Sequence, residues 1–358
     1  MTAMEKTVAV ALSGGLDSAV AGALLKQGNY RVIGFHFRTG YECGPGDPTP
    51  SGQPSDLDSR VQTVSEQLGI PLEVVDCSEA FETEVVRYFI DAYRSGQTPN
   101  PCVVCNQRIK FGFLLEKIRA LGISTLATGH YARIHRQVDG QHYLMKGIDE
   151  VKDQSYFLAR LTQEQLRHAM FPLGIYTKNQ VKETALTLGL KSLMQKESQE
   201  LCFVRHSRYA EFLINHAESS GRPGPIVNTK GDILGHHKGL HIYTVGQRRG
   251  IGIPGPVPYY VIHLDQEKNR LIIGPKSELA AKECTVTDVN WIGAESPEKA
   301  ISARTRIRYR HQEAESILRP LDPHTVVVRF SQDQYAITPG QAAVFYQGER
   351  VLGSGWIG

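Results

Sequence analysis

The sequence opens with a short β-branched run that ends in a glycine-rich loop, and this junction constrains the fold more than any other feature. Residues 7–12 are apolar and β-branched, which predicts a buried strand. The string Ser-Gly-Gly-Leu-Asp-Ser follows at residues 13–18, and residues 19–26 have the composition of a helix. A second strand is predicted over residues 30–37. This order of strand, loop, helix and strand predicts a doubly wound, mostly parallel α/β sheet.

The same alternation continues to about Leu190. Further helices are predicted over residues 57–68, 80–95 and 110–121, and further strands over residues 72–75 and 125–128. Residues 40–59 are rich in Gly, Pro, Ser and Asp, which predicts a mobile loop.

The composition and the predicted secondary structure change after about residue 207. Gly and Pro become frequent among short β-like runs, and from about residue 283 the runs alternate between apolar and polar positions. At 358 residues the chain is long enough for two or three domains. We predict an α/β catalytic domain over residues 1–206, a small β-rich connector over 207–282 and a C-terminal β-barrel over 283–358.

Composition narrows the class of protein. With 41% apolar and 22% charged residues, the chain is typical of a globular protein and not of a disordered one. The first ten residues do not have the pattern of a signal peptide, and no apolar run approaches the roughly 20 residues that cross a bilayer. We therefore expect a cytoplasmic protein with reduced cysteines and no membrane partner. The net charge of +3 permits a nucleic-acid partner without requiring one.

The glycine-rich loop has the properties of a phosphate site. Gly14 and Gly15 allow a tight turn and close approach of a ligand, and the N–H groups at the following helix start favour an anion. Ser13 and Ser18 offer hydroxyl groups, and Asp17 offers a carboxylate for magnesium. The loop matches neither the Walker nor the dinucleotide pattern. It resembles the loop of the ATP pyrophosphatases, which implies cleavage of ATP to AMP and pyrophosphate; the alternative is a plain glycine turn.

Cysteines supply a second chemical signal. Cys102 and Cys105 form a C-x-x-C, and Cys202 lies about 100 residues further on. The sequence has no second C-x-x-C, so a four-cysteine zinc site is not supported. A thiolate can accept a sulfane sulfur as a persulfide and attack an activated carbon, which suits sulfur transfer. We interpret the other three cysteines as incidental thiols: Cys43, Cys77 and Cys284.

Three histidines also lie close together in the sequence. His236, His237 and His241 could suggest a metal site, yet no Cys, Asp or Glu falls at ligand spacing around them. We therefore expect an exposed polar turn at this position.

Several separate strings together make the chain resemble the tRNA-specific 2-thiouridylases over almost its full length. They are residues 13–18, 98–111, 127–131, 152–158, 201–203, 244–250, 305–310 and 338–346. The resemblance implies that ATP adenylates the 2-carbonyl oxygen of the wobble uridine in certain tRNAs. It also implies that a persulfide on Cys202 delivers sulfur to the same carbon and that Cys105 helps to release it.

The resemblance also implies the roles of further residues. The ATP site would comprise Ala11, Leu12, Ser13, Gly14, Gly15, Leu16, Asp17, Ser18, Phe37 and Gly129. Residues expected against the target base are Asn100, Pro101 and Cys102, and those expected to contact tRNA elsewhere are His130, Lys152, Asp153, Gln154, Arg308, Tyr309 and Gln341. A sulfur donor, such as a cysteine desulfurase or a sulfur-relay protein, is the expected second partner.

One position departs from the family pattern. Much of the family has Asp where this chain has Cys102. Because thiolates are the usual ligands of iron–sulfur clusters, Cys102, Cys105 and Cys202 form a candidate three-thiolate site for a 4Fe–4S cluster with one open iron. The persulfide route and the cluster route both remain open at this point.

Two other functions compete with base thiolation. Another ATP pyrophosphatase, such as an amide-forming ligase for a small molecule, explains the loop but gives no role to Cys105 or Cys202. A nucleic-acid-binding protein without catalysis would tolerate loss of the cysteines and of Asp17, all of which are present.

Overall fold

The computed structural model describes residues 6–42, 56–138, 140–190, 193, 201–204, 212–213, 222–293 and 295–358. The chain divides into two compact units. The first comprises Met1–Val85, Cys102–Arg205 and Gly348–Val351, and the second comprises Val86–Pro101, His206–Gln347 and Leu352–Gly358. The three-domain division stays a prediction, and its boundary at residues 206 and 207 lies outside the described residues.

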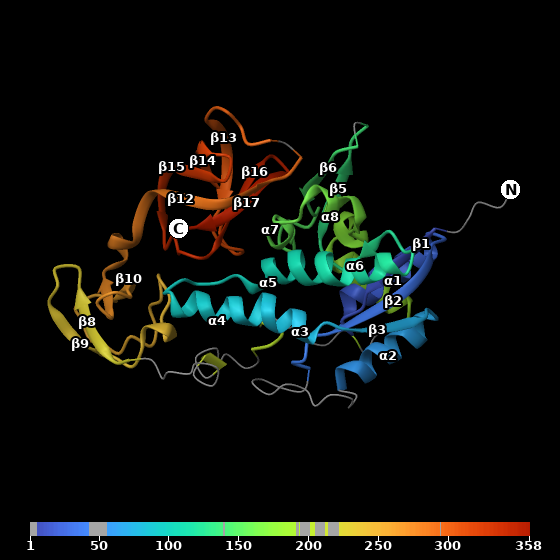
Figure 1. Cartoon of the computed structure of the whole chain (residues 1–358), viewed down its shortest axis with the longest axis horizontal. Coiled ribbons are helices and arrows are strands. Elements are labelled where there is room, and N and C mark those ends of the chain that lie inside the picture. Colours follow the sequence, from blue (N-terminus) through green and yellow to red (C-terminus); the bar gives the residue numbers. More distant parts are fainter. Residues whose placement is uncertain are drawn as a thin grey trace. The chain divides into compact units, whose positions relative to one another are not determined.

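A five-stranded parallel sheet forms the centre of the first unit (Figure 1). Its order is β3-β2-β1-β4-β7, and every neighbouring pair is parallel. The strands are β1 (Thr7–Ala11), β2 (Arg31–Arg38), β3 (Leu72–Asp76), β4 (Leu126–Ala127) and β7 (Ala169–Met170). Four of the five residues of β1 are buried, as expected for a central strand whose two faces are both covered. The predicted doubly wound parallel sheet is confirmed.

Helices of the first unit pack against this sheet. The side chains of α1 (Leu16–Gln27) are mostly small and apolar, and they join Val8 and Val10 of β1 in one buried core. Other α-helices of this unit include α2 (Asp56–Leu68), α3 (Ser78–Phe81), α6 (Leu115–Ala120), α7 (Ser155–Leu158), α8 (Gln163–His168) and α9 (Lys178–Thr187). The part of the 40–59 loop that is described ends at Glu42 and resumes in α2; residues 43–55 lie outside the described residues.

The helix that carries the C-x-x-C begins well before the predicted start at residue 110. It consists of α5 (Pro101–Val104), a π-helix (Cys105–Leu114) and α6. Pro101 is its first residue, a position where the missing N–H has no helical partner to lose and the fixed φ suits a helix. The prediction was wrong here because residues 101–109 lack the apolar period of a surface helix.

An antiparallel hairpin also departs from the predicted α/β alternation. Strands β5 (Ala132–Arg136) and β6 (His142–Lys146) pair with each other, and Met145 of β6 pairs with Arg350. This hairpin follows directly after the string Ala-Thr-Gly-His-Tyr at residues 127–131, so the site residues there lie between β4 and β5.

The second unit contains a small mixed sheet with the order β10-β11-β8-β9. Its strands are β8 (Gly224–Asn228), β9 (Ile233–His237), β10 (Tyr260–Asp265) and β11 (Arg270–Gly274). The predicted exposed turn is wrong in its conformation, because His236 and His237 belong to β9. His236 is exposed as predicted, whereas His237 is 1% exposed. The His237 Nε2 donates to the Asn269 carbonyl oxygen at 3.1 Å, and burial lowers the pKa of this imidazole. The buried His237 ring, which was predicted to be exposed, therefore has a hydrogen-bond partner inside the protein.

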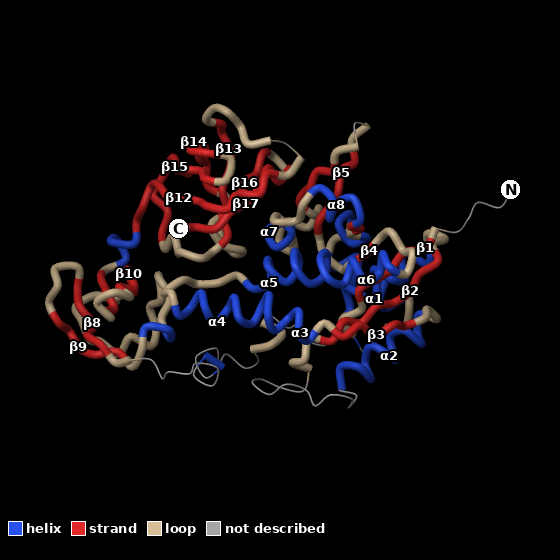
Figure 2. The backbone as a smooth tube through the Cα atoms, in the orientation of Figure 1, coloured by secondary structure: helices blue, strands red, loops and turns tan. Residues whose placement is uncertain are grey.

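A closed antiparallel barrel forms the C-terminal part of the second unit, as the strands in Figure 2 show. Its order is β12-β15-β14-β13-β16-β17, and a further pairing of β12 with β17 closes it. The strands are β12 (Ala280–Trp291), β13 (Ile301–Arg306), β14 (Ala314–Asp322), β15 (Thr325–Tyr335), β16 (Ala342–Gln347) and β17 (Arg350–Ile357). Val286, Val328 and Phe345 belong to its core. The predicted C-terminal β-barrel is confirmed.

The second unit also includes α4 (Arg87–Arg94) and the segment that follows it to Pro101. In the portion of the chain that is described, every helix is too short or too polar to span a bilayer.

Candidate active site

The loop between β1 and α1 has the backbone shape of an anion site. Gly14 has φ +69°, and a Cβ at this position would lie 3.2 Å from Val61 Cγ2. The Ser18 hydroxyl donates to the Gly15 carbonyl oxygen at 3.0 Å and accepts from the Ser13 N–H at 3.2 Å. These bonds hold the loop closed on itself, and the predicted residues Ser13 to Ser18 therefore lie together.

The first turn of α1 has N–H groups available for a ligand. Gly15 occupies the N-cap position in an extended conformation, and no described side chain caps the helix there. The initial N–H groups of a helix lack intrahelical partners, and the helix dipole adds partial positive charge at this end. The geometry is therefore suited to a phosphate group.

Asp17 is held by two side chains from distant parts of the first unit. Lys178 Nζ lies 2.7 Å from Asp17 Oδ1 and 2.8 Å from Oδ2. The Tyr131 hydroxyl donates to Oδ1 at 2.8 Å. The Lys178 side chain is 8% exposed and the Asp17 side chain is 33% exposed. The ammonium group is therefore buried, whereas the carboxylate that it contacts is partly open to solvent. Lys178 thus places a positive charge beside the loop of residues 13–18.

Gly129 makes the closest approach to this loop. A Cβ on Gly129 would lie 2.7 Å from the Asp17 carbonyl carbon and 2.8 Å from Ser18 N, so only glycine fits. The neighbouring His130 Nδ1 lies 2.7 Å from the Thr128 hydroxyl. Burial, followed by the nearby Lys110 ammonium, holds the pKa of His130 well below its usual value. His130 is therefore neutral at physiological pH and can act as a hydrogen-bond partner.

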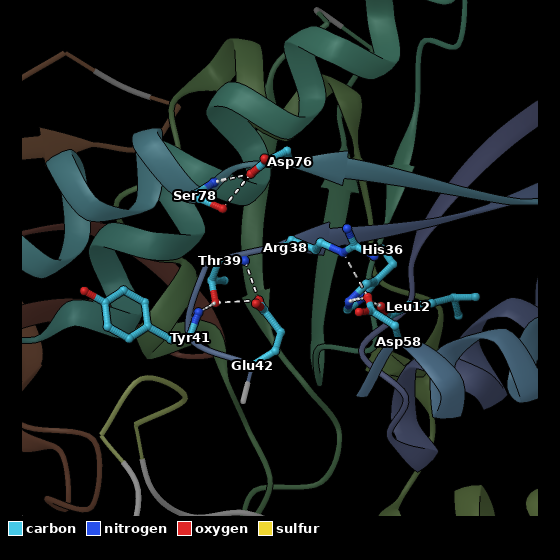
Figure 3. Close-up of polar contacts among 9 residues, drawn as sticks. All are labelled: Leu12, His36, Arg38, Thr39, Tyr41, Glu42, Asp58, Asp76 and Ser78. Carbon is cyan, nitrogen blue, oxygen red and sulfur yellow. Dashed lines mark hydrogen bonds and ion pairs between the residues drawn. The ribbon is translucent and has the colours of Figure 1, made fainter. Parts of the chain in front are cut away.

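Polar side chains near the carboxyl end of β2 contact Leu12, the residue before the loop, and Asp58 of α2 (Figure 3). The buried His36 ring donates from Nδ1 to the Leu12 carbonyl oxygen at 3.0 Å, because a carbonyl can only accept. Its Nε2 lies 3.5 Å from Asp58 Oδ1, and Arg38 Nε lies 3.1 Å from the same oxygen. Phe37, which was predicted for the ATP site, lies between His36 and Arg38 in the sequence of β2 and is half-buried.

The two cysteines predicted as catalytic, Cys105 and Cys202, and the predicted base contact Cys102 come close enough to influence one another. Cys102 and Cys105 are three residues apart on one helix and so share a face, and Cys105 is buried. Cys102 and Cys202 are exposed. Desolvation, followed by repulsion from Cys105, raises the pKa of the Cys102 and Cys202 thiols. The Lys110 ammonium opposes this rise at all three cysteines.

Phe203 anchors the Cys202 segment in an aromatic cluster. The Phe203 ring is 2% exposed and lies 5.7 Å from the Phe81 ring and 6.1 Å from the Tyr41 ring, measured between centroids. The Tyr41 hydroxyl donates to Glu82 Oε2 at 2.5 Å, and this bond fixes the position of the Tyr41 ring in the cluster. Cys202 is therefore attached directly to a buried residue while its own side chain stays exposed.

Three residues of the first unit that were predicted to contact tRNA, Lys152, Asp153 and Gln154, differ in burial and in hydrogen bonding. Asp153 is 2% exposed and accepts from the Gly147 and Ser155 N–H groups, both at 3.1 Å. Gln154 exchanges hydrogen bonds with the Tyr131 backbone, and its neighbour Lys152 is half-buried. Asp153 and Gln154 thus hold the turn at residues 152–155 in place, and Gln154 connects it to the Tyr131 backbone.

In the second unit the predicted tRNA residues also have intramolecular partners. Arg308 Nη1 donates to the Tyr335 and Ala336 carbonyl oxygens at 3.1 and 3.3 Å, and Tyr309 beside it is half-buried. Gln341 Nε2 donates to two carbonyl oxygens of residues 98 and 99. Asn100 and Pro101 are buried.

Sequence reasoning missed Lys178, Lys110 and His36. Lys178 follows Thr177, which caps α9 in a capping box with Gln180, so the sequence signal was that of a helix start and not of a nucleotide site. Lys110 lies five residues after Cys105 on a π-helix, and no sequence signal pointed to its proximity to the thiols.

Three family models together match nearly the whole chain. The model described as tRNA methyl transferase HUP domain matches residues 6–206, that described as tRNA methyl transferase PRC-barrel domain matches 210–275, and that described as Aminomethyltransferase beta-barrel domain matches 281–357.

Full-length relatives point to the same family. The tRNA-specific 2-thiouridylase MnmA of Geobacter metallireducens is 46% identical over 99% of this chain and 97% of its own length. Those of Halothermothrix orenii and Syntrophotalea carbinolica are each 44% identical, over 98% and 100% of both chains. The resemblance found in the sequence is confirmed, and the chain belongs to the tRNA-specific 2-thiouridylase family.

Proposed function

We propose that this protein is an ATP-dependent tRNA uridine 2-sulfurtransferase that converts the wobble uridine to 2-thiouridine and releases AMP and pyrophosphate. The observation that carries the proposal is the presence, in one compact unit, of an uncapped helix start behind a glycine loop and of three mutually interacting thiols. An ATP-splitting ligase without sulfur chemistry would need only the first of these features.

In the first step, the 2-carbonyl oxygen of uridine attacks the α-phosphorus of ATP, and pyrophosphate leaves. The loop N–H groups and the Lys178 ammonium are suited to stabilise the negative charge of the phosphates. Magnesium, when bound with ATP, would neutralise phosphate oxygens, and the partly exposed Asp17 carboxylate would hold it. Adenylation turns the oxygen of C2 into part of a good leaving group.

In the second step, the terminal sulfur of a persulfide on Cys202 attacks C2, and AMP leaves with the former carbonyl oxygen. The Cys105 thiolate then attacks the Cys202 sulfur, which releases the thiolated base and forms a Cys105–Cys202 disulfide. An external dithiol reduces this disulfide, and a sulfur donor of the desulfurase or relay class restores the persulfide. Cys105 lies close enough to Cys202 to raise the pKa of the Cys202 thiol, and this proximity supports the pairing.

The described side chains do not fit a 4Fe–4S cluster. Among the residues that are described, no group of three or more Cys, His, Asp or Glu side chains is arranged to hold a metal ion. Cys102, Cys105 and Cys202 therefore lack the convergent geometry of cluster ligands in this arrangement. For this reason the proposed mechanism has no step through a cluster.

For tRNA, we propose that exposed and half-buried basic groups meet the phosphate backbone. Lys152 is the clearest candidate of the first unit, since its neighbours Asp153 and Gln154 fix the turn that presents it. In the barrel, Tyr309 offers a ring for stacking and Arg308 a guanidinium for phosphate.

The proposal is tested with purified protein, ATP, a persulfide donor and unmodified tRNA, followed by mass spectrometry of the nucleosides. We expect 2-thiouridine with the wild-type protein, none with Cys202→Ser, and native yield with Cys284→Ser, whose thiol lies in the barrel strand β12. ATP–pyrophosphate exchange that does not need tRNA, without any thiolated uridine, would instead favour a small-molecule ligase.

A further inference from the structure

The turn before β16 holds the chain segment that leads into the C-x-x-C helix. The Thr98 N–H donates to the Pro339 carbonyl oxygen at 2.8 Å. Gln341 Nε2 donates to the Thr98 carbonyl oxygen at 3.0 Å and to the Pro99 carbonyl oxygen at 3.1 Å. One turn of the barrel thus supplies partners for three successive backbone groups of a segment more than 240 residues away.

Gly340 allows the two backbones to come this close. It has φ +85°, and a Cβ there would lie 2.8 Å from Gln97 Cβ and 3.0 Å from both Thr98 N and Thr98 O. Real Cβ atoms do not make such contacts, so any other residue would push the segment away from the turn. Glycine is required here for both its conformation and its small size.

The turn is itself fixed to the last strand of the barrel. The Gly340 N–H donates to the Ile357 carbonyl oxygen at 2.8 Å, and the Ile357 N–H donates to the Gln341 carbonyl oxygen at 2.9 Å. A second contact comes from α4, where the Tyr88 ring lies 6.0 Å from the Trp356 ring of β17. The turn contacts β17 through hydrogen bonds, and α4 contacts it through ring packing.

The first residues after α4 are held by that helix, since the Gly96 and Gln97 N–H groups donate to the Tyr93 and Ala92 carbonyl oxygens. From Thr98 to Asn100 the chain belongs to no helix or strand, and Pro99 and Pro101 lack an N–H group. The Asn100 N–H finds the Tyr88 hydroxyl at 3.3 Å. Without the turn, the Thr98 and Pro99 carbonyl oxygens would lose their partners in a half-buried region, which is unfavourable.

We propose that Gly340 and Gln341 are positioning residues, and that the barrel turn acts as a clasp that sets the place of Asn100 and Pro101 at the target uridine. The clasp is defined as Pro339, Gly340 and Gln341 bound to Thr98 and Pro99. The inference rests on the proposed function for its consequence, since Asn100 and Pro101 are expected against the base. It changes the role of Gln341 from tRNA contact to control of the segment before Cys102.

Two variants break the clasp in different ways. Gln341→Met removes both donated bonds with little change in length and no change in charge. Gly340→Ala leaves Gln341 intact but forces the segment outward. Gly348→Ala is the matched control, because Gly348 also has positive φ (+57°) in the barrel yet a Cβ there meets nothing within 4 Å.

The test measures thiolation under saturating tRNA and ATP, the Kd for tRNA, and hydrogen exchange of the peptide that contains the Thr98 amide. For both clasp variants we expect thiolation to fall by on the order of tenfold to a hundredfold, as misplacement of reacting groups does. We also expect an unchanged Kd for tRNA and faster exchange at Thr98, while Gly348→Ala stays native in all three.

Native thiolation at saturating tRNA together with a weakened Kd in Gln341→Met would overturn the clasp in favour of a direct tRNA contact. Unchanged exchange at Thr98 in both variants would also overturn it. If the wild-type protein makes no 2-thiouridine, the proposed function fails, whereas the exchange measurement still reports on the clasp by itself.

Discussion

Lys178 and Asp17 lie 161 positions apart in the sequence, yet the Lys178 ammonium contacts both carboxylate oxygens of Asp17, at 2.7 and 2.8 Å. The same ammonium lies 5.7 Å from the centre of the Tyr131 ring, whose hydroxyl also bonds Asp17. The pair joins the start of α9 to the start of α1 and places a buried cation where the phosphates of ATP are expected.

Replacing Lys178 tests its part in adenylation. Lys178→Met keeps most of the side-chain volume but removes the charge beside the phosphate loop. We expect tRNA-dependent ATP–pyrophosphate exchange to fall by about a hundredfold, as loss of one preorganised charge-stabilising group does. Binding of tRNA should be unaffected.

Lys182→Met is the matched control for this variant, because Lys182 lies on the same helix and is exposed. Equal exchange rates for Lys178→Met and the wild type would show that the cation serves only to hold Asp17 in place.

Phe203 is predicted to govern sulfur delivery without affecting ATP. Phe203→Ala empties a site between Phe81 and Tyr41 and releases Cys202 from its buried neighbour. We expect thiolation to fall by about a hundredfold because the thiol is no longer held in position. Pyrophosphate exchange should remain native, since the phosphate loop is untouched.

Tyr41→Phe separates packing from hydrogen bonding in the same cluster. It keeps the ring that contacts Phe203 and loses only the bond to Glu82, so its thiolation should lie much closer to the wild type. Loss of exchange and thiolation to the same degree in Phe203→Ala would contradict a role confined to sulfur delivery.

Serine substitutions at the three cysteines distinguish the two sulfur routes. In the persulfide route, Cys202→Ser and Cys105→Ser abolish thiolation, whereas Cys102→Ser retains it. In the cluster route all three abolish it, and protein purified without oxygen contains iron and sulfide. Colourless, iron-free protein that thiolates tRNA would exclude the cluster, and iron that is lost in Cys102→Ser together with activity would exclude the simple persulfide route.

We predict that His311 makes the stability of the barrel depend on pH. Burial and the neighbouring Arg308 and Arg306 lower the pKa of His311 to about 4 in the folded protein, compared with an ordinary value of 6.5. The unfolded chain therefore binds this proton first as pH falls, so the contribution of His311 to stability is present above pH 6.5 and is lost between pH 6.5 and 4.

Thermal unfolding measured over this pH range checks the effect. His311→Gln removes the titrating group, and we expect its melting temperature to decline less steeply with acidification than that of the wild type. Parallel declines in the two proteins would show that other groups control the pH dependence.

Local patterns predicted the parallel sheet, the glycine-rich loop and the barrel, because the signals for their strands, turns and helices lie in residues adjacent in sequence. The β-branched run before Ser13 and the glycines after it specify a strand and a turn without reference to the rest of the chain. Such local patterns could not predict contacts between segments that are distant in the sequence. The bonds of Lys178 to Asp17 and of Gln341 to Thr98 arise only when the tertiary fold brings these residues together.

The same reason explains the wrong prediction at His237. Its polarity indicated a surface turn, yet the Asn269 carbonyl oxygen satisfies its ring in a buried strand. The early start of the helix at Pro101 was missed because residues 101–109 lack the apolar period of a surface helix.

The central claim, that ATP activates the 2-oxygen of uridine for replacement by sulfur, is tested most directly by following that oxygen. A tRNA carrying ¹⁸O at the 2-position of the wobble uridine is thiolated in a single turnover, and the AMP and pyrophosphate are analysed by mass spectrometry. The proposed mechanism predicts one ¹⁸O in each AMP formed and none in pyrophosphate. Unlabelled AMP alongside 2-thiouridine would contradict it.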